Sequence, residues 1–178
     1  MLCGYQEART SMLISASRRE HISSPRRWIA PPINQLHLDV DAAYNVHSNR
    51  YAIGGVVRNH EGQTLLASGK QITKPPSIVA SELIAIEEGF QMTQTQNLRI
   101  NQITSDSLMA VQAVTSPTED FGYTGAFATK IRNLLATHAR LKLEHVLRTA
   151  NGVAHSLASF DISSPSPFVW ICGEFPFG

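Results

Sequence analysis

Residues 36–44, which read LHLDVDAAY, constrain the fold of this chain more than any other stretch. Apolar side chains occupy positions 36, 38, 40 and 42, and polar side chains alternate with them over positions 37 to 41. An alternation with a period of two is typical of a β-strand that packs one face on a core. The opposite face then carries two aspartates, Asp39 and Asp41. Because charged faces are common in solvated sheets, these residues become functional candidates only through the acidic residues that follow them along the chain.

The composition indicates one globular domain with tails. A chain of 178 residues has room for a single sizeable core, and a hydrophobic share of 43% with a charged share of 16% excludes a disordered chain. The net charge is only +1, and the positive charge is concentrated in the basic residues 1–35. A nearly neutral core argues against strong non-specific binding to nucleic acid, but it allows a weak or metal-assisted contact.

The ends of the chain bear on where the protein acts. Cys3 and Cys172 lie near opposite termini without metal-ligand spacing, which favours free thiols in a reducing compartment. No apolar run has the length of a membrane span. We therefore expect an intracellular monomer, in the nucleus or the cytoplasm, with no membrane partner. The Arg- and Ser-rich, acid-poor start carries a weak signature of an organellar transit peptide, and a solvated tail or a truncated upstream domain fits it equally well.

The first half of the chain predicts an antiparallel meander. Residues 51–58 and 63–71 are two β-rich runs joined by the short loop NHEG, a pattern typical of a hairpin. Gly54 and Gly55 lie within the first of these runs, where a glycine indicates that another chain segment approaches closely. Together with residues 36–44, these runs give three consecutive antiparallel strands.

The second half predicts helices that alternate with strands. Ser77 is a suitable N-cap for a helix over residues 77–94, on which Glu82 flanks the apolar stripe while Glu87 and Glu88 should face water. The segments that follow are a strand ending at residue 106, a short helix, a helix around residues 127–138, a strand over 141–148 and a last helix. Such a succession indicates crossover connections and parallel strand pairing.

These elements predict an α/β fold of three layers with a mixed five-stranded sheet. The fold should span residues 31–160. Residues 1–30 should form a flexible, basic N-terminal tail, and residues 161–178 a Pro- and Ser-rich C-terminal tail.

Three acidic residues stand at particular places in this order of elements: Asp41 in the first strand, Glu82 in the first helix and Asp106 at the end of the fourth strand. Converging carboxylates without cationic partners repel one another and raise each other's pKa, so such a trio needs a cation. Oxygen ligands suit Mg²⁺ or Mn²⁺, and a pair of such ions can hold the attacking and leaving oxygens of a phosphodiester.

Six segments in this order resemble ribonuclease H-like domains, specifically the plant reverse-transcriptase-like branch found alone or at the ends of retroelement polyproteins. The segments are RRWIAPP, LDVDAAY, IGGVVRNHEG, SELIAIEEG, TSDSLMAV and HVLRTANGVAHSLA. The resemblance covers residues 28–160. It implies that Asp41, Glu82 and Asp106 are the catalytic metal ligands. It also implies a metal-dependent endonuclease that cleaves the RNA strand of RNA–DNA hybrids, which it would recognise through the 2′-hydroxyls and the backbone.

His155 departs from the pattern of the wider family, whose enzymes place a fourth carboxylate at this position. Imidazole is a poor ligand for Mg²⁺ and brings no negative charge, so one metal position should be weak. His155 can instead serve as a catalytic proton shuttle, or it can be an ordinary helix residue in an inactivated site. The alternative functions are accordingly a catalytically impaired, retroelement-derived module that binds nucleic acid or a protein without turnover, and a plain interaction domain.

Three further residues and one loop bear on the site. Arg148 and Asn151 are candidates for contacts with phosphate, or they are ordinary loop residues. Asp39 should be a neighbour on the catalytic face and not a metal ligand. The loop over residues 116–123 is acidic where some family members insert a basic arm, so the affinity for a hybrid should be low.

Overall fold

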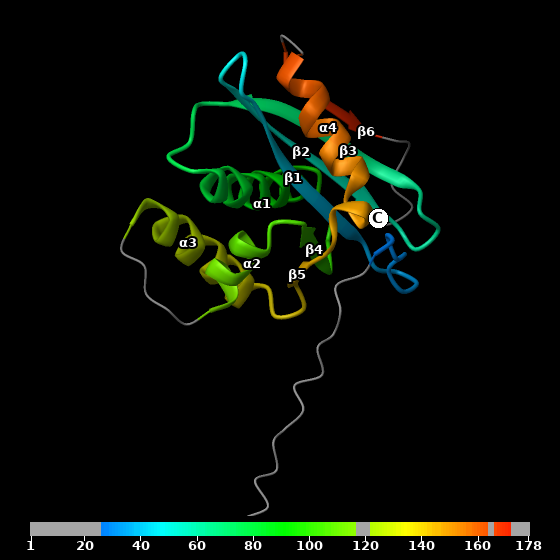
Figure 1. The fold of residues 1–178 in the computed structure, drawn as a ribbon. Coiled ribbons are helices and arrows are strands. Elements are labelled where there is room, and N and C mark those ends of the chain that lie inside the picture. Colours follow the sequence, from blue (N-terminus) through cyan, green and yellow to red (C-terminus); the bar gives the residue numbers. More distant parts are fainter. Residues whose placement is uncertain (1–25, 117–121, 164–165, 172–178) are drawn as a thin grey trace, which may run out of the picture.

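The computed structural model describes residues 26–116, 122–163 and 166–171. They form the predicted α/β fold of three layers (Figure 1). A mixed sheet is the middle layer, α4 covers one of its faces, and α1 covers the other with α2 and α3 packed against it. The strands are β1 (His37–Asn45), β2 (Arg50–Arg58), β3 (Thr64–Ile72), β4 (Gln102–Ser105), β5 (Lys142–His145) and β6 (Phe168–Ile171). The helices are α1 (Ile78–Thr95), α2 (Leu108–Thr115), α3 (Tyr123–Thr137), the short 3₁₀ helix η1 (Arg148–Ala150) and α4 (Gly152–Ser163).

The order of strands in the sheet is β5-β4-β1-β2-β3-β6. β1, β2 and β3 pair antiparallel, which confirms the predicted meander, and β4 and β5 join β1 in parallel. Parallel neighbours need a crossover, and α1 provides the one between β3 and β4. As a result, the carboxyl end of β4 lies beside the middle of β1, although more than fifty residues separate the two strands along the chain.

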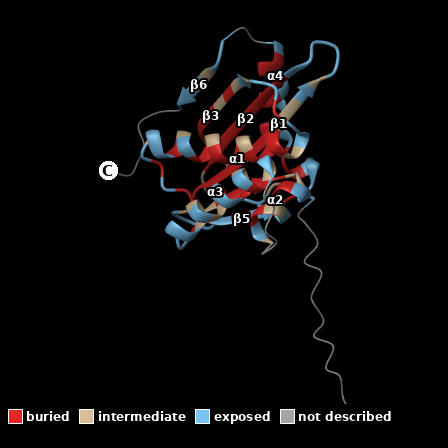
Figure 2. Ribbon diagram, turned by 90° about the vertical axis from the view of Figure 1, so that its left-hand side faces the viewer, coloured by how far each residue is buried: buried red, intermediate tan, exposed pale blue. Residues whose placement is uncertain are grey.

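The core lies between the sheet and α1. Leu38 and Val40 of β1 are fully buried and face α1, whose Leu83 and Ile86 are also buried. Ser77 caps the amino end of α1, as predicted, by accepting a hydrogen bond from the backbone N–H of Ala80. In Figure 2 the buried residues follow the central strands and the helix sides that face them. No helix of the described residues is long and apolar enough to cross a membrane.

The sheet has a sixth strand where five were predicted. The edge strand β6 pairs antiparallel with β3 and comes from the segment predicted as a C-terminal tail. α4 also runs on to Ser163, past the predicted boundary at residue 160. This strand could not be predicted from the sequence, because the turn-forming residues Ser166 and Pro167 precede it and the strand itself is only four residues long.

The fold also begins before the predicted boundary at residue 31. Residues 26–32, called the N-terminal strap below, lie against the sheet. The ring of Trp28 packs under the guanidinium group of Arg58, 3.9 Å from the ring centroid, and also contacts Gly62. Residues 1–25, the larger part of the predicted N-terminal tail, are outside the described residues.

Glu87 does not face water as predicted. It is buried on the side of α1 that meets α3, where Lys130 forms an ion pair with its carboxylate and Gln91 donates a hydrogen bond to it. Helical spacing alone could not reveal this, because the neighbouring helix supplies both the cover and the charge. Glu88 is partly exposed and pairs with Lys70.

The predicted close approach at the glycines of β2 is found at Gly54. A Cβ atom there would lie 2.4 Å from the backbone nitrogen of Ala158 and 2.7 Å from the backbone oxygen of Ala154, so α4 rests directly on β2. We expect Gly54→Ala to destabilise the fold by about 2–3 kcal/mol in urea unfolding, because the helix backbone cannot yield as a flexible side chain could.

Gly152→Ala is the matched control, since a Cβ atom at Gly152 would meet no atom within 4 Å. This variant should be as stable as the wild type or slightly more so, because alanine favours a helix. If both variants unfold at the same urea concentration, the docking of α4 on β2 is not tight.

Candidate metal centre

The three predicted carboxylates meet in the structure. β1 and β4 are parallel and pair Asp39 with Thr104, so two residues further along each chain Asp41 lies level with Asp106. Asp106 follows the last residue of β4, and Ser107 then caps the amino end of α2. Glu82 reaches the same place from α1. One carboxylate oxygen from each of the three residues lies within 4.8 Å of the other two.

The cluster is held in place and shielded from water. Asp41 is fully buried, and Glu82 is 7% exposed. The backbone N–H of Ala42 donates a hydrogen bond of 3.2 Å to Oε2 of Glu82, which ties α1 to β1 at this point. Among the described residues, Oδ1 of Asp41 is buried and accepts no hydrogen bond. A buried carboxylate oxygen without a donor is unusual and indicates an oxygen that is available to another ligand.

Burial and mutual proximity raise the pKa values of two of the acids. Burial, with the nearby charge of Asp106, raises the pKa of Asp41 to about 6. Burial, with the charges of Asp41 and Asp106, raises the pKa of Glu82 to about 8. Each shift means that the ionised form lacks sufficient positive charge around it. The cluster therefore has the electrostatic character of a site for a cation.

Arg148 and His155 border the cluster. Nη1 of Arg148 lies 3.1 Å from Oδ2 of Asp106 and 3.9 Å from Oδ1 of Asp41. Nδ1 of His155 lies 2.7 Å from Oδ2 of Asp41, and Nη2 of Arg148 lies 2.6 Å from Nδ1 and 3.0 Å from Nε2 of the same imidazole. A neutral imidazole that donates from Nδ1 to Asp41 can accept from Arg148 only at Nε2, so Arg148 and Asp41 compete for Nδ1. The side chain of Arg148 is 56% exposed, so it can leave the carboxylates without disturbing the core.

Asn151 does not lie where a phosphate contact requires it. Its side chain is fully buried, and Nδ2 donates a hydrogen bond of 2.8 Å to the backbone oxygen of Val40 and a longer one of 3.5 Å to Asp106. The structure therefore favours the alternative, in which Asn151 is a structural loop residue, over a contact with phosphate. Asn151 instead ties the loop before α4 to β1 and thereby sets the positions of Arg148 and His155.

Asp39 lies on the same face of β1 as Asp41 but outside the cluster, as predicted. It forms a buried ion pair with Arg58, at 2.5 Å, and accepts a hydrogen bond of 2.6 Å from Thr104. A carboxylate that is paired in this way is not free to bind a metal. This pairing was not predicted from the sequence. The position of Arg58 at the end of the second run of the meander was the available signal, because it places the side chain across from the start of β1.

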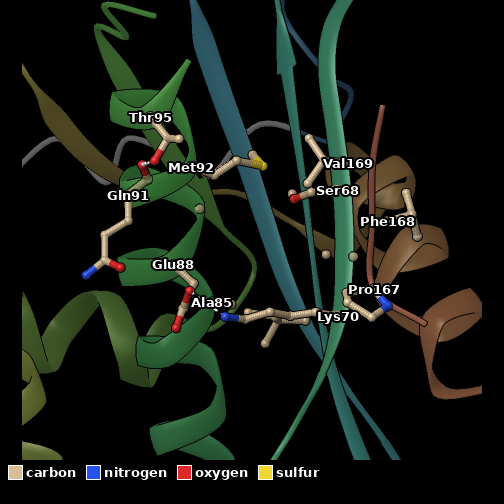
Figure 3. A pocket seen from close by; sticks show the side chains of 15 residues that line it. Ser68, Lys70, Ala85, Glu88, Gln91, Met92, Thr95, Pro167, Phe168 and Val169 are labelled. Atoms are coloured by element: carbon tan, nitrogen blue, oxygen red, sulfur yellow. Dashed lines mark hydrogen bonds and ion pairs between the residues drawn. The ribbon is translucent and has the colours of Figure 1, made fainter. Parts of the chain in front are cut away.

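A pocket of about 250 Å³ lies elsewhere, between α1 and the strands β3 and β6 (Figure 3). Ser68, Lys70, Glu88, Met92 and Val169 line it, and the ion pair between Lys70 and Glu88 closes one side. None of the carboxylates of the cluster and neither of the side chains that border it lines this pocket. The candidate site is therefore the carboxylate cluster and not an enclosed cavity.

The fold and the position of the acidic cluster define a ribonuclease H-like domain. LC11-RNase H1, isolated from compost by a metagenomic approach, superposes with a TM-score of 0.63 at 19% identity, covering 73% of this chain and 96% of that chain. RNase H1 from the halophilic archaeon Halobacterium salinarum gives a TM-score of 0.61 at 20% identity, covering 72% and 97%. LC11-RNase H1 in complex with an RNA/DNA hybrid gives 0.63 at 18% identity, covering 72% and 96%.

The family follows from the sequence itself. Residues 39–161 match the family model described as reverse transcriptase-like, and the chain belongs to that family. A comparison with curated protein sequences gives no match.

The residues present fit a divalent metal ion, which this fold family implies. The donor set consists of carboxylate oxygens only, which Mg²⁺ and Mn²⁺ prefer, and it includes Oδ1 of Asp41, which accepts no hydrogen bond. The raised pKa values of Asp41 and Glu82 show that the site gains from added positive charge.

These pKa values predict how the stability of the metal-free protein depends on pH. A carboxyl whose pKa is higher in the folded than in the unfolded state favours folding at low pH, and this contribution disappears as the pH rises through the folded value. For Glu82 the loss extends from pH 4.5 to about 8. His37, whose pKa is lowered by burial, acts in the opposite direction, but only below pH 6.5. We therefore expect the free energy of unfolding in EDTA to fall between pH 6.5 and 8.5, by about 2 kcal/mol.

Glu82→Gln provides the comparison, because glutamine can still accept the hydrogen bond from Ala42 but cannot ionise. Urea unfolding of this variant in EDTA should show a much smaller fall over the same pH range. An identical fall in both proteins would show that Glu82 is not the group responsible.

Proposed function

We propose that this protein is a divalent-metal-dependent endonuclease that cleaves the RNA strand of RNA–DNA hybrids. The observation that carries the proposal is the buried cluster of Asp41, Glu82 and Asp106, with carboxylate oxygens within 4.8 Å of one another on a ribonuclease H-like sheet. The hybrid bound by LC11-RNase H1, a protein of the same fold, supports this class of substrate. A hybrid has an A-like minor groove lined with 2′-hydroxyls, so a protein can recognise it by shape and backbone, without reading bases.

Each residue of the centre has a task in this proposal. Asp41 and Asp106 would hold Mg²⁺ or Mn²⁺, and Glu82 would complete the ligand set. When bound, the ion supplies positive charge for the phosphate oxygens and lowers the pKa of water. Arg148 leaves the carboxylates and pairs with a phosphate, as a guanidinium group does readily through two hydrogen bonds. His155 stays hydrogen-bonded to Asp41 and can take up or release a proton beside the leaving group.

One observation favours a second candidate, a module of retroelement origin that binds nucleic acid or a protein without turnover. The cluster has a guanidinium group at 3.1 Å from Asp106 and an imidazole at 2.7 Å from Asp41, where an enzyme with four acids has a further carboxylate. The positive charge of Arg148 lowers the affinity of the cluster for a metal ion, because the guanidinium group and the ion are attracted to the same carboxylates.

A cleavage assay separates the two candidates. The full chain is incubated with a hybrid labelled on its RNA strand, in Mg²⁺, in Mn²⁺ and in EDTA, beside double-stranded DNA and double-stranded RNA of the same sequence. The proposal expects RNA fragments from the hybrid alone, formed only with metal and lost in Glu82→Gln. An intact hybrid that is nevertheless bound under all three conditions would support the module without turnover.

A further inference from the structure

The N-terminal strap, residues 26–32, lies beside the metal centre without belonging to it. The strap passes over the same face of the sheet that carries Asp41, where it lines a pocket together with His37, Asp39 and Thr104. In Figure 1 this first described stretch of chain, in blue, is next to the orange segment that leads into α4. The hydroxyl of Thr149 donates a hydrogen bond of 2.5 Å to the backbone oxygen of Arg26 and so joins the two segments.

A chain of contacts holds the strap in place. Trp28 packs under Arg58, Arg58 pairs with the buried Asp39, and Asp39 accepts a hydrogen bond from Thr104 of β4. A buried ion pair contributes little net stability but requires a defined geometry. Here that geometry fixes the position of an indole ring that would otherwise lie at the surface, and with it the position of the two residues before it.

The strap presents positive charge next to the centre. Arg26 and Arg27 are both exposed, and the Thr149 that binds the strap is the neighbour of Arg148. Arg26 and Arg27 are thus joined through Thr149 to the segment of Arg148, which contacts Asp106. One acid, Glu144, is exposed near Arg27, and Gln102 donates a hydrogen bond to it. Arg26 and Arg27 form no ion pair among the described residues.

We propose that the strap is a phosphate-binding surface through which Arg26 and Arg27 hold the backbone of a nucleic acid duplex over the metal centre. This inference rests on the proposed function and adds a binding surface to it. The charge of the whole chain is only +1, so affinity for a polyanion depends on cations gathered at one place. The acidic cluster itself repels phosphate, which makes positive charge along its border necessary.

The test compares the full-length wild type with R26Q/R27Q. Binding of a short fluorescein-labelled RNA–DNA hybrid is followed by anisotropy in Ca²⁺, at several KCl concentrations between about 50 and 200 mM. Loss of two phosphate contacts should weaken binding about tenfold and reduce the slope of log K against log salt by about 1.8. The rise in melting temperature caused by Mn²⁺ should be unchanged, because neither arginine touches the carboxylates.

Three further variants sharpen the test. K70Q/R99Q removes the same charge from the opposite face of the sheet and from the loop between α1 and β4, and it should bind with nearly the wild-type slope. Trp28→Ala keeps both arginines but loses the ring that anchors them, so it should weaken binding as well, whereas Trp28→Phe should restore much of the affinity.

The outcomes distinguish this inference from the proposed function. Equal affinity and equal salt slope for the wild type and R26Q/R27Q would overturn the role of the strap and leave the proposed function intact. A wild type that binds no hybrid would overturn both. If R26Q/R27Q loses the response to Mn²⁺, the strap acts on the metal centre and not on phosphate, and the inference is overturned.

Discussion

Asp106→Asn should abolish most of the stabilisation that Mn²⁺ gives to the folded protein. An ion present at a hundred times its dissociation constant stabilises the folded state by about 2.7 kcal/mol, because it binds that state alone. For a fold of this size, the melting temperature of the wild type should then rise by about 5–10 °C. Asparagine has the shape of aspartate without its charge, so the variant keeps the fold but offers one ionised ligand fewer.

Without metal, Asp106→Asn should also differ from the wild type in stability. Asp106 helps to raise the pKa of both Asp41 and Glu82, so its replacement relieves their repulsion. The same change weakens the ion pair with Arg148, which is partly exposed and therefore contributes little. We thus expect Asp106→Asn to be at least as stable as the wild type in EDTA near pH 8, and less stable than the wild type in Mn²⁺.

Thermal unfolding of both proteins, with and without millimolar Mn²⁺, checks this expectation. Glu61→Gln is the matched control, because it removes an exposed carboxylate from the loop between β2 and β3 and should retain the full response. An equal rise in melting temperature for Asp106→Asn and the wild type would mean that Mn²⁺ binds somewhere else.

His155→Asp should raise the rate of hybrid cleavage in Mg²⁺ about tenfold or more, equivalent to about 1.4 kcal/mol of activation free energy. Nδ1 of His155 lies 2.7 Å from Asp41, so a side chain at this position reaches the cluster. Aspartate would add both an oxygen ligand and a negative charge, which Mg²⁺ prefers to imidazole. The wild type should correspondingly be more active in Mn²⁺ than in Mg²⁺, since Mn²⁺ accepts nitrogen more readily.

Single-turnover rates in each metal measure this effect, and His155→Asn separates its causes. Asparagine supplies an oxygen without charge, so a gain limited to His155→Asp would show that charge is the deciding factor. The contrary result is also informative. If His155→Asp slows cleavage and changes the pH–rate profile near neutrality, the imidazole transfers protons in the reaction.

The sequence by itself determined the elements and the identity of the carboxylates. The alternation in residues 36–44, the cap at Ser77 and the spacing of apolar residues on α1 are local patterns. They indicate the secondary structure without any knowledge of the tertiary contacts. The convergence of Asp41, Glu82 and Asp106 could also be predicted from their order along those elements, because a parallel pairing of β1 with β4 brings Asp41 level with Asp106. The resemblance to ribonuclease H-like domains rested on the same segments.

Only the tertiary structure decided what surrounds these acids. His155 and Asp41 are 114 positions apart, and Arg26 and Thr149 are 123 apart, so no local pattern reports that they touch. The burial of Glu87 depends on Lys130 of another helix, and the burial of Asn151 depends on the backbone of β1. The positions of the strap, of the sixth strand and of Arg148 beside the cluster could not be predicted from local sequence for one physical reason. Each is stabilised by a partner that folding brings from far along the chain, and neither propensity nor periodicity contains that partner.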